Sequence, residues 1–305
     1  YEIVPVLDIK HPKNVVNVTD MSPFHVDWVK KNIKNFAQDI KKAKLFFKAN
    51  ELYGAESHIN GFSGYVLEVL VIHYKGFDNL IKAASNWKDK VIIDINKKHK
   101  NVLKSLNYSK TYGPLILIDP VQDDRNAAAA VSFEQFNKFI FLSKLYLESP
   151  SEDFFVNEKF NKNNLIKEAK TSGYELTILE VTPVEGKNDI VGSKIVKFIN
   201  LIKKQLELND FKIFDSGFNW DKKIIIWFFT WPNLLPKFKK QEGPKVYSNN
   251  VDIFKFIDKH NEIMLEKDRI FAKVKRKYTD VQSLVKNLVK EKHIKEKVKK
   301  IKFNP

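Results

Sequence analysis

The spacing of apolar residues changes along the chain, and this change constrains the fold more than any other feature of the sequence. Between Ser22 and Ala49, apolar side chains recur every three or four residues, as on one face of an α-helix. Ser22 can cap this helix, with Pro23 at its first position. The glycine-punctuated segment 53–65 predicts a tight turn and lacks the spacing of a dinucleotide-binding or P-loop motif. Residues 66–74 are apolar almost throughout, which indicates a buried helix.

The sequence after Pro150 has a different pattern. Residues 174–181 alternate as in a β-strand, and residues 195–206 have the spacing of an amphipathic helix. Residues 211–214 and 223–229 are predicted to form a hairpin across the turn-rich segment between them. The order βαββ is typical of a helix packed on an antiparallel sheet. With the helical first half, it predicts an α+β protein.

Two short strands are predicted inside the helical half, at residues 91–95 and 114–120. The second strand leads into a polar segment, and a helix is expected from Ala127 to about Glu148. Arg125 then lies at a helix start, where free backbone N–H groups and the helix dipole favour an anion such as phosphate. An arginine at a helix start is also commonly an ordinary surface residue. The pattern alone leaves both interpretations open.

The composition limits the type of protein. The chain has 305 residues, enough for roughly two domains, and its 43% of hydrophobic residues can fill packed cores. Cysteine is absent, which excludes a disulfide-stapled scaffold, a thiol nucleophile and metal sites built on thiolates. No stretch approaches the roughly 20 apolar residues of a membrane helix. We therefore expect a cytoplasmic protein with no membrane partner.

The chain is strongly basic, with 53 lysines and arginines against 37 acidic residues and a net charge of +16. This excess is typical of proteins that bind nucleic acid, although a lysine-rich surface that is merely solvated fits equally well. The excess is steepest at the end of the chain, where residues 286–302 contain eight lysines and two glutamates. This end is predicted to be helical. We expect four of its lysines to contact RNA phosphates: Lys286, Lys290, Lys295 and Lys299.

The first seven residues alternate like a β-strand, but no partner strand precedes them and no hairpin signal follows. A strand needs neighbouring strands to be stable. We therefore expect that Glu2 lies on a strand of a larger sheet, and that the rest of this sheet comes from a segment ahead of Tyr1.

Six short segments of the first half stand in a fixed order and spacing: Asp20–Trp28, Lys44–Asn50, Leu52–Glu56, Gly61–Tyr65, Asp119–Val121 and Arg125–Ser132. In this register they resemble the archaeal class I CCA-adding enzymes, which are tRNA nucleotidyltransferases. The resemblance is specific over residues 1 to about 155. The βαββ module and the lysine-rich end resemble the family mainly by position and charge.

The resemblance implies a template-independent polymerase that adds C, C and A to the 3′ end of tRNA, using CTP, ATP and Mg²⁺. It also implies a homodimer whose body and tail hold the acceptor and T arms of tRNA. Residues 1–20 would be the remnant of a nucleotidyltransferase head, and residues 21–150 a neck that reads the incoming base. Residues 151–250 would form the α+β body, and residues 251–305 the helical, tRNA-binding tail.

The resemblance also assigns roles to individual residues. Glu2 stands directly before Ile-Val-Pro, where a catalytic and metal-binding aspartate belongs, and the other two metal carboxylates should precede it. His25, Lys44 and Tyr53 fall on nucleotide-contacting positions, and Arg125 on the arginine that helps to recognise the incoming base. A lysine offers a point charge to a triphosphate, and an arginine offers a fixed fork of donors to a base.

Two other functions stay open at this stage. A related nucleotidyltransferase such as a poly(A) polymerase would extend RNA with A and would not need CTP. A non-catalytic RNA-binding module would bind tRNA-like helices with a steep salt dependence and would turn over nothing.

Overall fold

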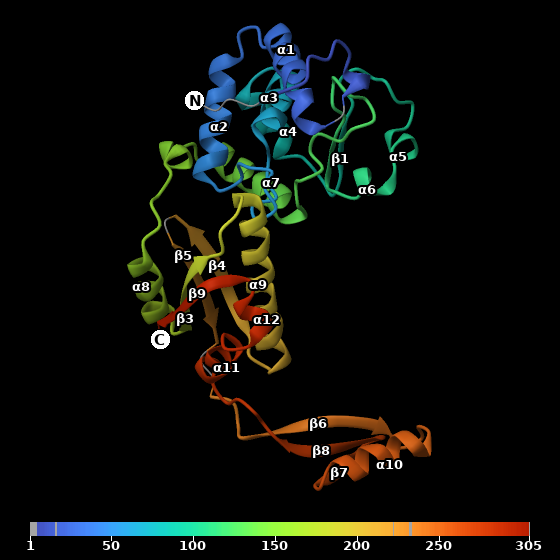
Figure 1. The fold of residues 1–305 in the computed structure, drawn as a ribbon, viewed down its shortest axis with the longest axis vertical. Coiled ribbons are helices and arrows are strands. Elements are labelled where there is room, and N and C mark those ends of the chain that lie inside the picture. The colour runs from blue at the N-terminus through green and yellow to red at the C-terminus, as the bar shows by residue number, and fades with distance from the viewer. Residues whose placement is uncertain (1–4, 16, 222, 232–233, 305) are drawn as a thin grey trace. The chain divides into compact units, whose positions relative to one another are not determined.

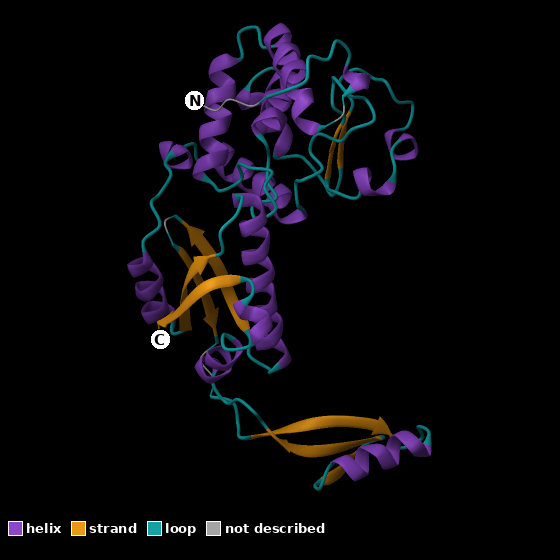
Figure 2. Cartoon of the chain, viewed as in Figure 1, coloured by secondary structure: helices purple, strands orange, loops and turns teal. Residues whose placement is uncertain are grey.

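The computed structural model describes residues 5–15, 17–221, 223–231 and 234–304 (Figure 1). The chain divides into two compact units, Tyr1–Lys159 and Phe160–Pro305. Helices dominate the first unit, whereas antiparallel sheets are the main feature of the second (Figure 2). This mixture confirms the predicted α+β class.

In its described residues, the first unit contains helices of very different length and a small parallel sheet. The sheet pairs β1 (Val91–Ile93) with β2 (Leu115–Leu117), which confirms the two predicted short strands. Single 3₁₀ turns lie at Pro12–Asn14, Val18–Met21 and Glu152–Phe155. The α-helices are α1 (Ser22–Asn32), α2 (Ala37–Ala49), α3 (Gly64–Tyr74), α4 (Phe77–Ala84), α5 (Val102–Ser105), α6 (Tyr108–Thr111) and α7 (Phe133–Glu148).

Phenylalanine rings fill the core of the first unit. Phe47 on α2 contacts Phe62 and Phe139, with ring centroids 5.0 and 4.6 Å apart, and all three side chains are fully buried. Burial of one such ring stabilises a fold by about 1.5–3 kcal/mol. Helix α3 is apolar on nearly all sides and packs against α1, α2 and α4. Its position, which matters for the site described below, is therefore rigidly fixed.

The helical pattern predicted over residues 22–49 is confirmed and comprises two helices, α1 and α2. The helical conformation is interrupted between α1 and α2, where Lys34 has a φ of +41°. This left-handed conformation cannot continue a right-handed helix. Ser22 is the first residue of α1 and not its cap, because the preceding 3₁₀ turn runs directly into the helix.

The helix predicted from Ala127 begins later, at Phe133. Ser132 accepts a hydrogen bond from the backbone N–H of Gln135 at 3.2 Å and so caps the helix. Arg125 therefore lies in the loop between β2 and α7, and its predicted place at a helix start is wrong.

The strand predicted over the first seven residues falls mostly outside the described residues, and Glu2 is among those. Residues 5–7 are not in a strand. The backbone N–H of Leu7 instead donates to the Asp20 carboxylate at 3.1 Å.

The second unit is built on a four-stranded antiparallel sheet in the order β4-β5-β3-β9. The predicted order βαββ is confirmed by β3 (Glu175–Pro183), α9 (Asn188–Leu208), β4 (Ile213–Trp220) and β5 (Ile224–Thr230). β4 runs through the segment predicted as the hairpin loop. Gly217 on this strand is required, because a Cβ there would lie 2.4 Å from the Trp227 ring. α8 (Lys162–Ser172) precedes this sheet.

The expectation of a helical tail over residues 251–305 is wrong. This segment holds α10 (Asn250–Lys259), α11 (Val281–Leu288) and α12 (Lys292–Lys295), but also three strands. β7 (Ile263–Glu266) and β8 (Arg269–Lys275) form a second sheet with β6 (Phe238–Lys245), in the order β6-β8-β7. β9 (Val298–Asn304) pairs with β3.

The reason for this error lies in the lysines. Along β8, buried Ile270 and Ala272 alternate with more exposed neighbours, which is the period of a strand. Along β9, Val298 is buried and Ile301 and Phe303 pack on the same core. In β9, lysines occupy positions 299, 300 and 302 between these apolar residues, so the strand pattern is hard to see in the sequence.

Candidate functional site

The candidate site gathers around the first turn of α3. Ser63 caps this helix by accepting a hydrogen bond from the N–H of Val66 at 3.2 Å. In the loop before it, the N–H of Phe62 donates to the carbonyl of Leu52 at 2.8 Å. Gly61 permits this close approach, because a Cβ there would lie 2.2 Å from the Leu52 oxygen. The predicted tight turn is thus confirmed, and it brings Tyr53 to the start of α3.

Lys44 and Tyr53 meet at Gly64, the first residue of α3. A Cβ added to Gly64 would lie 2.8 Å from the Tyr53 hydroxyl and 3.8 Å from Cε of Lys44. The Lys44 ammonium donates to Glu68, one turn further along α3, at 2.7 Å. About a third of the Lys44 side chain is exposed. The ammonium and the hydroxyl are therefore placed to donate to one anionic ligand.

His25 and Arg125 meet on a second carboxylate, that of Asp119. His25 Nε2 and Arg125 Nη1 lie 3.0 and 2.8 Å from the same oxygen, Oδ2. The Tyr65 hydroxyl donates to the other oxygen at 2.9 Å, as does the N–H of Val121 at 3.0 Å. The imidazole of His25 also stacks on the Tyr65 ring, with centroids 4.0 Å apart. The two predicted residues, 100 positions apart in the sequence, thus belong to one cluster.

The electrostatics of this cluster favour an ionised Asp119. Burial opposes ionisation, but the hydrogen bonds from His25 and Val121 and the charges of His25 and Arg125 outweigh it and hold the pKa of Asp119 below its ordinary value. Burial, together with the Asp119 charge and hydrogen bond, raises the pKa of Tyr65 well above its usual range. Tyr65 is therefore a permanent hydrogen-bond donor, and Asp119 is a permanent anion at neutral pH.

The loop that carries Arg125 is held by its own backbone and by Asn126. The N–H of Asp119 donates to the carbonyl of Arg125 at 2.9 Å. The buried amide of Asn126 accepts from the N–H of Leu117 at 3.0 Å and donates to the carbonyl of Leu115 at 3.1 Å. These bonds tie the loop to β2, so the Arg125 backbone has one fixed position.

Arg125 keeps donors available for a ligand. Both of its contacts use Nη1, and no contact to Nη2 or Nε is recorded within the described residues. One third of the side chain is exposed. A planar guanidinium with one anchored corner can offer its remaining N–H groups to acceptors on a base or a phosphate.

The sequence interpretation missed three members of this site. Tyr65 and Asp119 lie inside segments that carried the resemblance, but neither was assigned a role, and Glu68 was not considered. Two signals could have pointed to Asp119: it directly follows an apolar strand, and Arg125 comes six residues later. Nothing in the sequence pairs Tyr65 with Asp119, because 54 residues separate them.

The other predicted site residues lie elsewhere. Glu2 is outside the described residues. Lys286 and Lys290 are exposed on and just after α11, and the Lys286 ammonium lies 5.2 Å from the Phe303 ring centroid. Lys299 on β9 pairs with Glu185 at 3.1 Å. Lys295 lies on α12, but its side chain is outside the described set.

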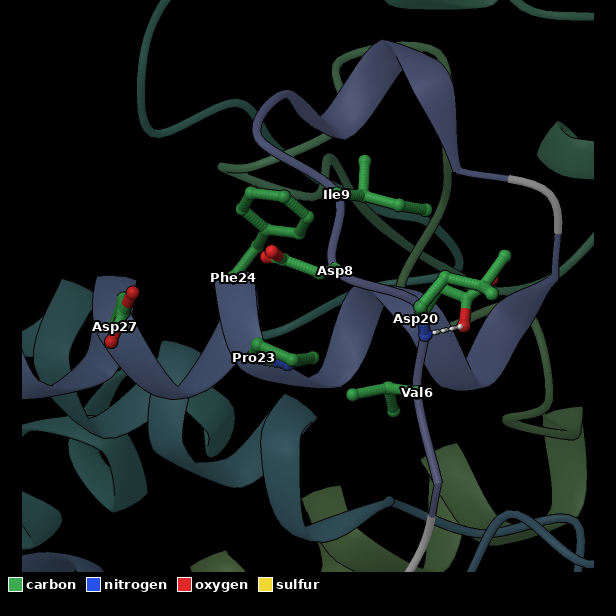
Figure 3. A pocket seen from close by; sticks show the side chains of 8 residues that line it. Val6, Asp8, Ile9, Asp20, Pro23, Phe24 and Asp27 are labelled. Atoms are coloured by element: carbon green, nitrogen blue, oxygen red, sulfur yellow. Dashed lines mark hydrogen bonds between the residues drawn. The ribbon is translucent and has the colours of Figure 1, made fainter.

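A pocket of about 300 Å³ lies between residues 6–9 and the start of α1 (Figure 3). Asp8, Asp20 and Asp27 line it, with Asp8 beside Phe24. One oxygen of Asp20 is used by the N–H of Leu7. In the part of the chain that the structure describes, no three His, Cys, Asp or Glu side chains are grouped so that they could hold a metal ion. The described residues alone therefore do not fit a magnesium site.

None of the described helices combines the length and the apolarity that a bilayer crossing requires.

Comparisons with known proteins match each of the two units to a domain of the same enzyme family. Residues 38–156 match the family model for the second domain of tRNA nucleotidyltransferase, and residues 179–302 the model for the C-terminal domain of CCA-adding enzymes. The CCA-adding enzyme of Nanoarchaeum equitans is 38% identical over 93% of this chain and 71% of its own length. Those of Methanococcus maripaludis and Methanocaldococcus jannaschii are 30% and 31% identical, over 94% of this chain. The chain spans 66% and 64% of those two relatives.

Proposed function

Because the chain belongs to the CCA-adding enzymes, we propose that it serves the addition of C, C and A to the 3′ end of tRNA, with CTP and ATP as substrates. The observation that supports this proposal most directly is the arrangement at α3. Lys44 and Tyr53 lie beside Gly64 at the start of α3. His25 and Arg125 contact Asp119, which also accepts a hydrogen bond from Tyr65, the second residue of α3.

In this proposal the two halves of the site have different tasks. Lys44 and Tyr53 donate to the triphosphate, which is the same in CTP and ATP. Arg125 offers its free donors to the incoming base, and His25 donates to a phosphate beside it. In this proposal one nucleotide contacts both halves, which are joined through α3 because Gly64, Tyr65 and Glu68 all lie on that helix.

The metal chemistry is proposed from the resemblance alone. Oxygen ligands suit Mg²⁺, and Glu2 is the one ligand that the resemblance places within this chain. The described residues do not form the site, so we assign them no metal-dependent step.

The second unit is proposed to hold the acceptor and T arms of tRNA, with Lys286, Lys290, Lys295 and Lys299 on phosphates. Lysines at exposed positions give affinity without base specificity, and that affinity falls steeply with salt. We also propose a homodimer and a cytoplasmic location.

The test combines turnover and binding. The protein, expressed with any residues that its gene encodes ahead of Tyr1, is incubated with Mg²⁺, labelled CTP and ATP, and a tRNA that lacks its 3′ CCA. The same tRNA is followed by gel shift. We expect saturable binding and ordered addition of C, C and A. Extension with A alone, without a need for CTP, would indicate a poly(A) polymerase, and binding without any incorporation would indicate a non-catalytic RNA-binding module.

A further inference from the structure

The Asp119 carboxylate has four hydrogen-bonding or ion-pair partners, and three of them are side chains. Its side chain is completely buried, and each of its oxygens has two partners. One partner, the N–H of Val121, belongs to the same loop. The other three are side chains from α1, from α3 and from the middle of that loop: His25, Tyr65 and Arg125. A buried ion pair costs desolvation and is weak evidence for stability as such, so the arrangement calls for another explanation.

We propose that Asp119 and Tyr65 are positioning residues that fix the orientation of the Arg125 guanidinium and thereby set the choice of C and A over U and G. This proposal rests on the proposed function, because it assigns a cause to the base selectivity of the same site.

The first step of the argument is that Asp119 fixes Arg125. An arginine side chain has many rotamers, and a partly exposed one samples several of them. Here Nη1 lies 2.8 Å from Asp119 Oδ2 and 3.2 Å from His25 Nε2, so one corner of the plane has two neighbours. The loop also closes on itself through the bond from the Asp119 N–H to the Arg125 carbonyl. The backbone and the tip of Arg125 are thus both tied to one residue.

The second step is that Tyr65 fixes Asp119. Its hydroxyl holds Oδ1 at 2.9 Å, so the carboxylate cannot rotate without losing this bond. The Tyr65 ring stacks on the imidazole of His25, with centroids 4.0 Å apart, and so restricts the position of His25, the second contact of Arg125. Tyr65 is the second residue of α3, whose apolar faces are buried in the core. The orientation of Arg125 is therefore linked, through Asp119 and Tyr65, to a helix that is packed into the core.

The third step connects orientation to selectivity. On their base-pairing edges, C and A present a ring nitrogen that accepts a hydrogen bond, whereas U and G present a ring N–H. Fixed N–H donors of Arg125 suit the first pair and oppose the second, because two donors then face each other. A guanidinium that could turn would also reach the carbonyl oxygens of U and G. Selectivity of this kind requires that the arginine be held in one orientation.

The experiment is a set of double-mutant cycles. Asp119→Asn and Tyr65→Phe are made singly and in combination with Arg125→Ala, in protein expressed with any residues encoded ahead of Tyr1. For each, kcat/KM is measured for CTP and ATP against UTP and GTP. Ser143→Ala is the control, since Ser143 is fully buried in the same unit and bonds only the Phe139 carbonyl among its recorded contacts.

We expect Asp119→Asn to lower the preference for C and A about ten-fold and Tyr65→Phe to lower it less, while Ser143→Ala leaves it unchanged. With Arg125→Ala present, neither change should lower the preference further, because both act through Arg125. Thermal melting checks that each variant is folded. Should Asp119→Asn fail to fold, Tyr65→Phe, which removes one hydroxyl, decides the question.

Three outcomes would overturn the proposal. Selectivity equal to that of the unmodified protein in both variants would remove the positioning role and leave the proposed function intact. An equal loss with and without Arg125 would show that Asp119 acts on the fold and not through Arg125. Absence of any C or A incorporation by the unmodified protein would instead overturn the proposed function, and the positioning role with it.

Discussion

The cluster around α3 and the lysines at the end of the chain are both rich in positive charge, but they are built in opposite ways. His25, Lys44 and Arg125 each contact a carboxylate, on Glu68 or Asp119, at 2.7–3.0 Å. Lys286, Lys290 and Lys299 are exposed, and Lys299 pairs with Glu185, whose side chain is 92% exposed. In the first region, contacts to carboxylates hold the cationic side chains in place. In the second, the lysine side chains are exposed to solvent.

This difference teaches which task each region can perform. Choosing one base over another requires donors in a fixed place, since the chemical difference lies in a few atoms of the base edge. Holding an RNA backbone requires only charge at the right distance, since every phosphate is alike. Four predictions test this contrast, in order of decreasing effect.

Replacement of Phe62 by alanine should have the largest effect. The ring is fully buried against Phe47 and Phe139, under the turn that places Tyr53. The cavity should lower the free energy of unfolding of the first unit by about 3–5 kcal/mol, measured by urea denaturation. Phe141→Ala is the matched control, because that ring is 60% exposed and its loss should change the free energy by no more than about 0.5 kcal/mol. Equal effects would contradict the packing described here.

Asp119→Asn should destabilise the protein by about 2 kcal/mol at pH 7, as a hydrogen-bonded buried charge is lost. The pKa of Asp119 is lowered in the folded state, so its contribution is complete above the unfolded value of about 3.9 and disappears as the pH falls through the folded value. The difference from the unmodified protein should therefore be present at pH 7 and shrink as the pH falls below about 4. Denaturation curves at several pH values measure it, with the exposed Asp89→Asn as control. A difference that grows in acid would contradict the assigned charge state.

Lys44→Ala should weaken the binding of CTP and ATP by the same factor, about ten-fold, because a phosphate contact does not depend on the base. The measurement is the nucleotide KM in tRNA extension. Lys41→Ala, on the exposed face of the same helix, should leave both values unchanged. An effect on one nucleotide only would place Lys44 at the base and not at the triphosphate.

Single changes among the terminal lysines should have the smallest effect. Lys286→Gln, Lys290→Gln or Lys299→Gln should each weaken tRNA binding slightly and reduce the salt slope of log K by about one. Gel shifts between about 50 and 200 mM salt measure this slope. Lys82→Gln, an exposed lysine on α4, should not change it. A loss of base selectivity in any of these variants would contradict the assignment of these lysines to phosphates alone.

The sequence predicted local features well and distant pairings poorly. The helical spacing of α2, the buried helix α3 and the order β3-α9-β4-β5 are properties of neighbouring residues, and all were predicted. The bond between Tyr65 and Asp119 spans 54 residues, and β3 pairs with β9 about 120 residues later. Nothing in the local pattern encodes such pairs, since tertiary packing decides them. His25, Lys44 and Tyr53 were singled out only through the resemblance, Arg125 also through its expected place at a helix start, and the carboxylates that contact His25, Lys44 and Arg125 were missed.

The pairing of β9 with β3 has a consequence for how the protein is made. β9 consists of residues 298–304, and α11, just before it, contributes Val281, Leu284, Val285 and Leu288 to the core of the main sheet. During synthesis, β3 leaves the ribosome long before its edge partner exists. The first unit can fold while translation continues, but the sheet of the second is complete only after residues 298–304 have been synthesised. A chain that stops before Val298 would therefore lack the edge partner of β3, and β3 would be left with an unpaired strand edge.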